Sequence, residues 1–223
     1  APFAGVKDAL AYTAGKNRVL DMMIHFATMT ADCFMTEYVY HGFWLRKLKR
    51  AFSRWQYGME GKAWNALYLE NHDHPRVINR YGSLRYWKES GKMLAACYIF
   101  QRGTPLLYQG QELGFRNVTW DNIDDYNDIS TRRHYHFLIH EGRTEEEALE
   151  AVRHFSRDSA RTPMQWTAEE NAGFTTGEPW LPVNDNYRTC NADSEEKDPD
   201  SVVSWYRTMA ALRNSHAELT EGS

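Results

Sequence analysis

The chain has few cysteines, and this scarcity excludes two classes of small protein. Cys33, Cys97 and Cys190 are the three cysteines among 223 residues, and they form neither a Cys-x-x-Cys pair nor a zinc-type pattern with histidine. An odd, widely spaced set of this kind is neither a disulfide framework nor a metal site. We therefore predict three reduced, mostly structural thiols, and no metal or other cofactor held by this chain.

The sequence also lacks long hydrophobic runs and a strong excess of charge of one sign. No apolar stretch approaches about 18 residues, so we expect no membrane-spanning segment in this chain. The net charge is −4 and the pI is near 6.2, with basic residues scattered rather than banded. This pattern argues against nucleic acid as a partner. No internal repeat or low-complexity tract stands out.

Short apolar runs alternate with amphipathic segments along the chain, and this alternation predicts parallel strands separated by helices. The expected strands are residues 22–26, 66–69 and 105–109. The expected helices are residues 6–14, 45–58, 84–101, 123–140, 144–154 and a last helix opened by Asp198-Pro199-Asp200. Thr144 and Glu147 have the spacing of a capping box. The basic residues of 45–58 are predicted to lie on a solvated helix face.

One polar motif comes directly after an expected strand. Residues 66–69 are followed by Asn71-His72-Asp73 and then Pro75, so a carboxylate and an imidazole lie where a strand becomes a loop. Strand ends of this kind form the active-site face of (β/α)₈ barrel enzymes. In the alternative interpretation Asp73 caps a turn and His72 is a buried core imidazole. For an isolated Asn-His-Asp motif we would favour that alternative.

Three further segments favour the catalytic interpretation of this motif, because they follow it in a recognisable order. The first is Gly103-Thr104-Pro105-Leu106-Leu107-Tyr108-Gln109-Gly110-Gln111-Glu112-Leu113-Gly114. The second is residues 156–166, which contain Arg161-Thr162-Pro163-Met164-Gln165-Trp166, and the third is residues 171–180. Together with Asn71-His72-Asp73 they resemble the α-amylase family of glycoside hydrolases. More narrowly, they resemble its α-glucosidase and oligo-1,6-glucosidase branch. The resemblance runs from about the first residue to about Arg213.

The resemblance implies an α/β fold that is the C-terminal part of a (β/α)₈ TIM barrel. Residues 1–119 are expected to hold strands 6 to 8, residues 120–197 an elaborated segment after strand 8, and residues 198–214 the last barrel helix. A whole barrel usually needs about 250 residues, and only three barrel-type strands are found here. The family's nucleophile and general acid/base belong to an upstream part, so we expect the rest of the same barrel as a partner and this chain alone to be inactive.

The resemblance also implies roles for individual residues. Retaining glycosidases use a nucleophilic and an acid/base carboxylate about 5–5.5 Å apart around an oxocarbenium-like transition state. Asp73 matches the family's third carboxylate, which stabilises that transition state and holds sugar hydroxyls. His72 and Arg157 match residues that bind the sugar at the same subsite. No metal ligand is matched.

Other residues of these motifs are expected to support the site. We interpret Arg161 as an internal ion-pair partner or loop anchor rather than a substrate ligand, and Arg76 as a brace of the Asn-His-Asp loop. Glu112 is expected at the rim without a chemical role, and Glu70 adds a charge near Asp73 whose effect is open. Four aromatic residues are placed to stack on sugars, although burial at loop bases is the commoner explanation; these are Tyr68, Trp166, Phe174 and Trp180.

The expected function is hydrolysis of α-glucosidic bonds in oligosaccharides of α-linked glucose by the complete protein, which we expect to be cytoplasmic. Two alternatives stay open. A trehalose synthase or sucrose isomerase belongs to the same family, and the amino-acid-transporter heavy chains are non-catalytic relatives. The presence of Asp73, His72 and Arg157 together favours an enzyme. Linkage preference and oligomeric state are not encoded in any motif of this chain.

Overall fold

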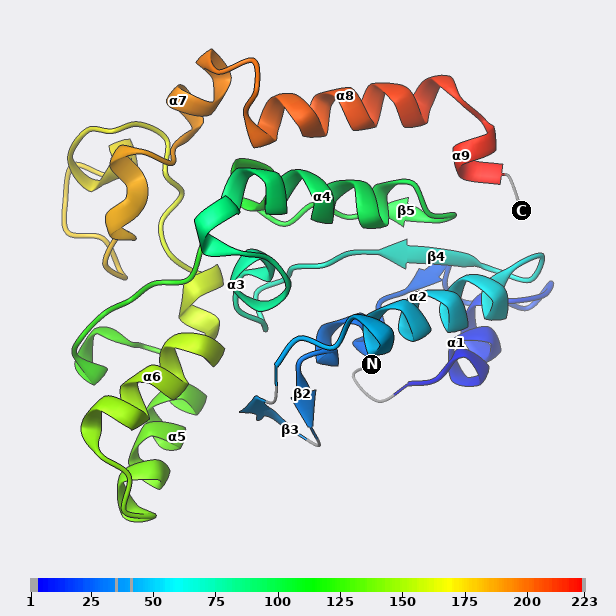
Figure 1. Ribbon diagram of the computed structural model, residues 1–223. Helices are drawn as coiled ribbons and strands as arrows, with labels where there is room; N and C mark the ends of the chain where they lie inside the picture. The colour runs from blue at the N-terminus through cyan, green and yellow to red at the C-terminus, as the bar shows by residue number, and fades with distance from the viewer. Residues whose placement is uncertain (1–3, 35, 41, 222–223) are drawn as a thin grey trace. The chain divides into compact units, whose positions relative to one another are not determined.

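The computed structural model describes residues 4–34, 36–40 and 42–221 (Figure 1). The chain forms two compact units. The first contains Ala1–Leu69, Ala95–Leu107 and Thr208–Ser223, and the second contains Glu70–Leu94 and Tyr108–Arg207. Two helices, α4 (Trp87–Ile99) and α8 (Val202–Ser215), contribute residues to both units. None of the described helices is long and apolar enough to cross a membrane.

The first unit is built around a parallel sheet of three short strands. β4 (Trp64–Leu67) lies between β1 (Met22–Met23) and β5 (Thr104–Pro105), with Met22 opposite Trp64 and Ala66 opposite Thr104. The parallel pairing is as predicted, but the strands are shorter. The expected residues 24–26 lie beyond the end of β1, and the expected residues 106–109 lie beyond β5, so these boundaries were wrong.

Gly103 permits the close approach of β5 to β4. Its φ of 147° lies outside the range that other residues readily adopt, and a Cβ there would come within 2.6 Å of the Asn65 carbonyl oxygen. Only glycine avoids both penalties. The glycine before the strand therefore has a packing function.

Helices cover the sheet of the first unit with an apolar cluster. α1 (Val6–Thr13) contributes Ala9, and α2 (Leu45–Met59) contributes Trp55 and Met59 to this cluster. Arg46, Lys49, Arg50 and Arg54 are exposed, as predicted for a solvated face of α2, whereas Lys47 is half-buried and donates to the Cys33 carbonyl at 2.7 Å. The unit also holds η1 (Ala27–Thr30), α9 (Glu218–Glu221) and an antiparallel hairpin of β2 (Cys33–Phe34) and β3 (Thr36–Tyr40) that the sequence did not reveal.

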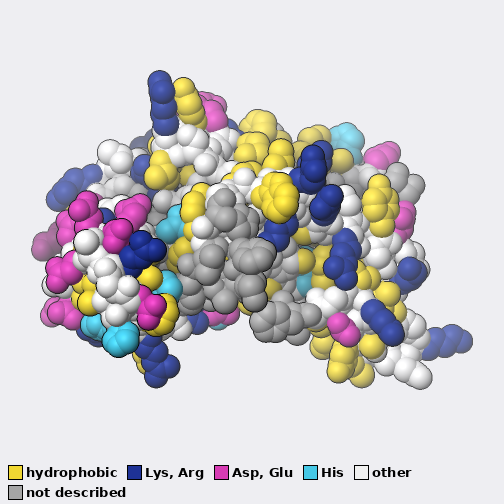
Figure 2. All heavy atoms as spheres, turned by 60° about the horizontal axis from the view of Figure 1, so that its bottom comes forward, with side chains coloured by type: hydrophobic (Ala, Val, Ile, Leu, Met, Phe, Trp, Pro, Cys, Tyr) yellow, Lys and Arg dark blue, Asp and Glu magenta, His cyan; other side chains and the backbone are white. Residues whose placement is uncertain are grey.

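The second unit is mainly helical. A pair of neighbouring helices, α5 (Ile129–His140) and α6 (Glu145–Phe155), packs around Tyr135, Ala148 and Val152. The predicted capping box of α6 is confirmed, because Thr144 Oγ1 accepts from the Glu147 amide and Glu147 Oε2 accepts from the Thr144 amide. Acidic side chains gather on one part of the surface in Figure 2, and the first turn of α6 is itself acidic, with Glu145, Glu146 and Glu147. The other helices are α3 (Val77–Tyr81), η2 (Leu84–Tyr86), η3 (Gln111–Leu113), η4 (Ile123–Asp125), η5 (Arg157–Ala160), η6 (Glu170–Gly173), η7 (Asp185–Arg188) and α7 (Ala192–Lys197).

The helix expected at residues 84–101 is instead η2 (Leu84–Tyr86) followed by α4 (Trp87–Ile99). Two further helix starts differ from the prediction. α5 begins at Ile129 rather than near residue 123, because Asp128 provides the cap by accepting from the Thr131 amide. α8 begins at Val202, and the Ser201 hydroxyl accepts from the Ser204 amide. Asp198 is instead the residue that ends α7. In both cases a short-range side-chain hydrogen bond a few residues further along the chain determines the helix start.

Candidate active site

The Asn71-His72-Asp73 motif forms a tight loop after β4. Asn71 Oδ1 accepts from the Asp73 amide at 2.8 Å, so Asn71, not Asp73, closes the turn. The Asp73 side chain is 36% exposed and the His72 side chain 67% exposed, with His72 Nε2 3.5 Å from Asp73 Oδ1. The interpretation of His72 as a buried core imidazole is therefore wrong.

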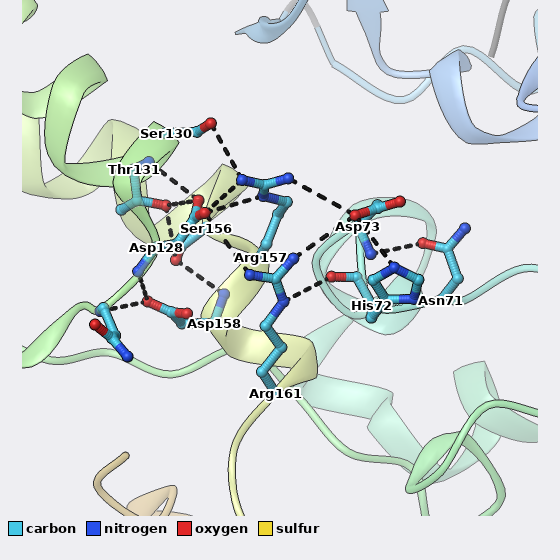
Figure 3. Close-up of polar contacts among 11 residues, drawn as sticks. Asn71, His72, Asp73, Asp128, Ser130, Thr131, Ser156, Arg157, Asp158 and Arg161 are labelled. Carbon is cyan, nitrogen blue, oxygen red and sulfur yellow. Dashed lines mark hydrogen bonds and ion pairs between the residues drawn. The ribbon is translucent and has the colours of Figure 1, made fainter. Parts of the chain in front are cut away.

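Two arginines from η5 and the residue after it approach this loop (Figure 3). Arg157 Nη1 lies 3.7 Å and Arg161 Nη2 3.6 Å from Asp73 Oδ1. Arg161 Nε also donates to the His72 carbonyl at 2.9 Å. Arg161 is thus the ion-pair partner and loop anchor that we predicted. The structure brings all three residues chosen as site residues, Asp73, His72 and Arg157, into one cluster.

Asp128 holds the opposite side of the arginine pair and was not recognised in the sequence. Its Oδ1 accepts from Arg157 Nε at 3.1 Å and from Arg157 Nη2, and it lies 3.7 Å from Arg161 Nη1. Its side chain is 2% exposed. Burial alone would raise the pKa of Asp128, but hydrogen bonds from Arg157 and Thr131 outweigh it and hold the pKa below its usual range. The available sequence signal was the Asp128-x-x-Thr131 cap spacing.

Asp158 attaches the segment before α5 to η5. Its Oδ2 accepts from the backbone amides of Asn127 and Asp128, at 2.7 and 2.8 Å. Burial raises the pKa of Asp158 above its usual value, while these two amide bonds oppose that rise. The backbone position of Asp128 is therefore fixed by the residue that follows Arg157 in sequence.

A closed ion pair lies directly next to this cluster along the chain. Glu70 and Arg76 are fully buried, with Arg76 Nη1 2.9 Å from Glu70 Oε2. Arg76 also donates to the carbonyls of Gln109 and Ser159, and Glu70 accepts from the Val77 amide. The predicted bracing role of Arg76 is confirmed. The charge of Glu70, whose effect the sequence left open, is compensated by Arg76.

The aromatic candidates separate into two groups. Tyr68 is buried and donates to the His25 carbonyl, as expected of a structural residue. Trp166, Phe174 and Trp180 are exposed, so burial at loop bases was the wrong expectation for these three. Trp180 lines an open cavity of about 420 Å³ together with Asp124 and Arg132. Glu112 lies in η3, and burial raises its pKa.

Asp73 is partly exposed and only loosely held by its neighbours. Its contacts to His72, Arg157 and Arg161 span 3.5–3.7 Å, beyond normal hydrogen-bond lengths. A hydroxyl group on the exposed side of Asp73 would donate to the carboxylate. Among the described residues, no group of three or more His, Cys, Asp or Glu side chains is arranged to hold a metal ion.

Comparison with known proteins identifies the family. The family model for the α-amylase catalytic domain matches residues 4–222. The chain belongs to this family, whose catalytic domain is a TIM barrel. It is 41% identical over 225 residues to an oligo-1,6-glucosidase of Parageobacillus thermoglucosidasius, a match covering 97% of this chain and 39% of that protein.

Solved structures give the same result. The chain is similar to the trehalose-6-phosphate hydrolase of Bacillus licheniformis, with 41% identity and a TM-score of 0.94 over 98% of this chain and 40% of that one. It is also similar to the isomaltulose synthase of Klebsiella sp. LX3, with 32% identity and a TM-score of 0.91 over 99% of this chain and 40% of that one. The chain thus spans about two fifths of the length of these relatives.

Proposed function

We propose that the complete protein is a retaining α-glucosidase-type glycoside hydrolase that cleaves α-glucosidic bonds of oligosaccharides. The observation that supports this best is Asp73, a partly exposed carboxylate with one imidazole and two guanidinium groups within 3.5–3.7 Å, in a chain of the α-amylase family. The similarity to an oligo-1,6-glucosidase supports α-linked glucose as the substrate class.

In this proposal Asp73 stabilises the positive charge that develops on the cleaved sugar ring, while His72 and Arg157 bind its hydroxyls. A fixed negative charge favours an oxocarbenium-like transition state more than the neutral ground state, so it lowers the barrier rather than merely tightening binding. The nucleophile and the acid/base are assigned to the part of the protein outside this chain. The three parallel strands β1, β4 and β5 are assigned to strands 6, 7 and 8 of the barrel.

A second candidate within the same family is isomerisation or transglycosylation, which the similarity to an isomaltulose synthase favours. Both reactions pass through the same glycosyl-enzyme intermediate, and they differ in whether water or a sugar accepts the glucosyl unit. A non-catalytic role, as in the transporter heavy chains, is disfavoured because Asp73 and Arg157 meet in the folded chain.

The test is an assay of the purified protein of full natural length on isomaltose, maltose, sucrose and trehalose 6-phosphate. Products are followed by NMR from the first minute, so that the anomer released is seen before mutarotation. We expect glucose release with retained α-configuration from isomaltose or maltose. New disaccharides from sucrose would instead establish the isomerase, and no turnover of any of the four would reject the enzymatic proposal.

A further inference from the structure

Asp128 controls the direction of the Arg157 guanidinium. Arg157 Nε and Nη2 both donate to Asp128 Oδ1, and Nη2 also donates to Ser130 Oγ at 3.1 Å. These two nitrogens form one edge of the planar guanidinium. Because the group is rigid, fixing that edge fixes the direction of Nη1, which lies 3.7 Å from Asp73 (Figure 3).

The Asp128 carboxylate is itself immobilised. Its Oδ2 accepts from the Thr131 amide at 3.1 Å and from Thr131 Oγ1 at 2.8 Å, while its own amide donates to Asp158. One oxygen therefore caps α5 and the other holds Arg157. Asp128, the residue that caps α5, thereby orients Arg157, which lies 29 residues further along the chain.

We propose that Asp128 is a positioning residue of the glycosidase site, acting on the sugar through Arg157. This rests on the function proposed above for the identity of the ligand. Asp128 is a buried carboxylate that reaches the Asn-His-Asp loop through Arg157 and Arg161. With Asp128 ionised, Arg157 presents Nη1 toward Asp73. Without that charge, the guanidinium loses its direction.

Asp128→Asn separates orientation from capping. Asparagine caps helices as well as aspartate does, so α5 keeps its start while the charge is removed. Once the amide oxygen takes the cap, the asparagine NH2 group faces Arg157, so the guanidinium loses its acceptor. A hydrogen bond to a charged group is worth at least about 1.5 kcal/mol, which corresponds to roughly tenfold in binding. In the full-length enzyme we expect KM for p-nitrophenyl α-D-glucoside to rise about tenfold, and kcat to change less than about threefold.

Thr131→Val is the matched control. It removes the Oγ1 contact to the same carboxylate and leaves Arg157 untouched. If Asp128 acted only by stabilising α5, Thr131→Val would raise KM in the same way as Asp128→Asn. That result would overturn the proposal, whereas an unchanged KM supports it.

A double-mutant cycle with Arg157→Lys tests whether the effect passes through Arg157. Residues that act through one another give non-additive effects. We expect Asp128→Asn to change KM by less than about twofold once lysine replaces Arg157, because lysine has no fork to orient. Fully additive effects would show that Asp128 acts by another route.

A readout without turnover distinguishes this proposal from the proposed function. The Arg157 Nε–H resonance is assigned by its loss in Arg157→Lys, and its exchange with solvent is measured by NMR. We expect slow exchange in the wild type, at least tenfold faster exchange in Asp128→Asn, and no change in Thr131→Val. If the wild type cleaves no glucoside, the proposed function fails and this exchange rate alone decides the role of Asp128. Equal rates in wild type and Asp128→Asn would refute it.

Discussion

The second unit contains two groups of charged residues that are adjacent in sequence and built on opposite principles. Glu70 and Arg76 are removed from solvent, and their contact is short, 2.9 Å, with further hydrogen bonds to backbone groups. Asp73 is partly exposed, and its contacts to Arg157 and Arg161 are 3.6–3.7 Å. The first pair is closed to solvent and held by protein groups, although Arg76 Nη2 has no hydrogen-bond partner among the described residues. The second cluster keeps capacity for a ligand.

The difference shows how a fold separates stability from function over a few residues. A buried ion pair holds a loop in place but costs desolvation, so it needs a close contact between the charges and further hydrogen bonds to offset that cost. A half-exposed carboxylate with long contacts adds little to stability, but it is ready to accept hydrogen bonds from a sugar.

Arg76→Met should have the largest effect on stability. It leaves Glu70 buried without its counter-charge and removes the donors to Gln109 and Ser159. We expect the free energy of unfolding to fall by about 3–5 kcal/mol, measured by urea denaturation at pH 7. The double variant Glu70→Leu/Arg76→Met should recover part of this loss, because no unpaired charge remains. A loss below about 1 kcal/mol for Arg76→Met alone would contradict the bracing role.

Asp73→Asn should have the opposite profile. The substitution is nearly isosteric and removes only charge, so the unfolding free energy should change little. In the full-length enzyme we expect kcat to fall by roughly 10²–10³-fold with a much smaller change in KM, as for the loss of one electrostatic stabiliser of a transition state. Steady-state kinetics with p-nitrophenyl α-D-glucoside measure this. A near-normal kcat would reduce Asp73 to a loop residue.

The sequence predicted features that depend on neighbouring residues. The Thr144–Glu147 capping box placed the start of α6 correctly, and the spacing of Leu48 and Trp55 placed α2 within a residue at its end. These signals are local hydrogen bonds and periodic burial, so they need no knowledge of the rest of the fold.

Features set by distant partners were not predictable in the same way. The apolar run at 22–26 gave no sign that pairing with β4 involves only Met22 and Met23. Asp128 was missed because its main partner, Arg157, is far along the chain and is brought close only by the packing of α5 and η5. Asp73 and Arg157 were found because a family resemblance supplied the long-range information that residue patterns lack.

His25, in the first unit, extends the comparison to a buried group without a counter-charge. Its ring stacks on Trp55 at 3.7 Å between centroids, and burial lowers its pKa from 6.5 to about 4. A depressed folded pKa means that stability is complete above pH 6.5 and is lost as pH falls toward 4, because the unfolded chain binds the proton more strongly.

We expect protonation of His25 to cost about 2 kcal/mol of unfolding free energy between pH 7 and pH 5. His25→Phe keeps a stacking ring and cannot titrate. The difference between its unfolding free energies at pH 7 and pH 5, measured by urea denaturation, should therefore be about 2 kcal/mol smaller than in the wild type. An equal pH dependence in both proteins would place the acid sensitivity elsewhere.

Asp124→Asn should have the smallest effect, and it tests whether distance alone determines the value of an ion pair. Asp124 Oδ1 lies 2.7 Å from Arg132 Nη2, closer than Asp73 lies to either of its arginines, yet both side chains are largely exposed. Solvent screens such pairs, so we expect a loss below about 0.5 kcal/mol, further reduced in 0.5 M salt, and unchanged kcat and KM in the full-length enzyme. A loss comparable with that of Arg76→Met would mean that contact length, rather than burial, distinguishes the two groups of charges.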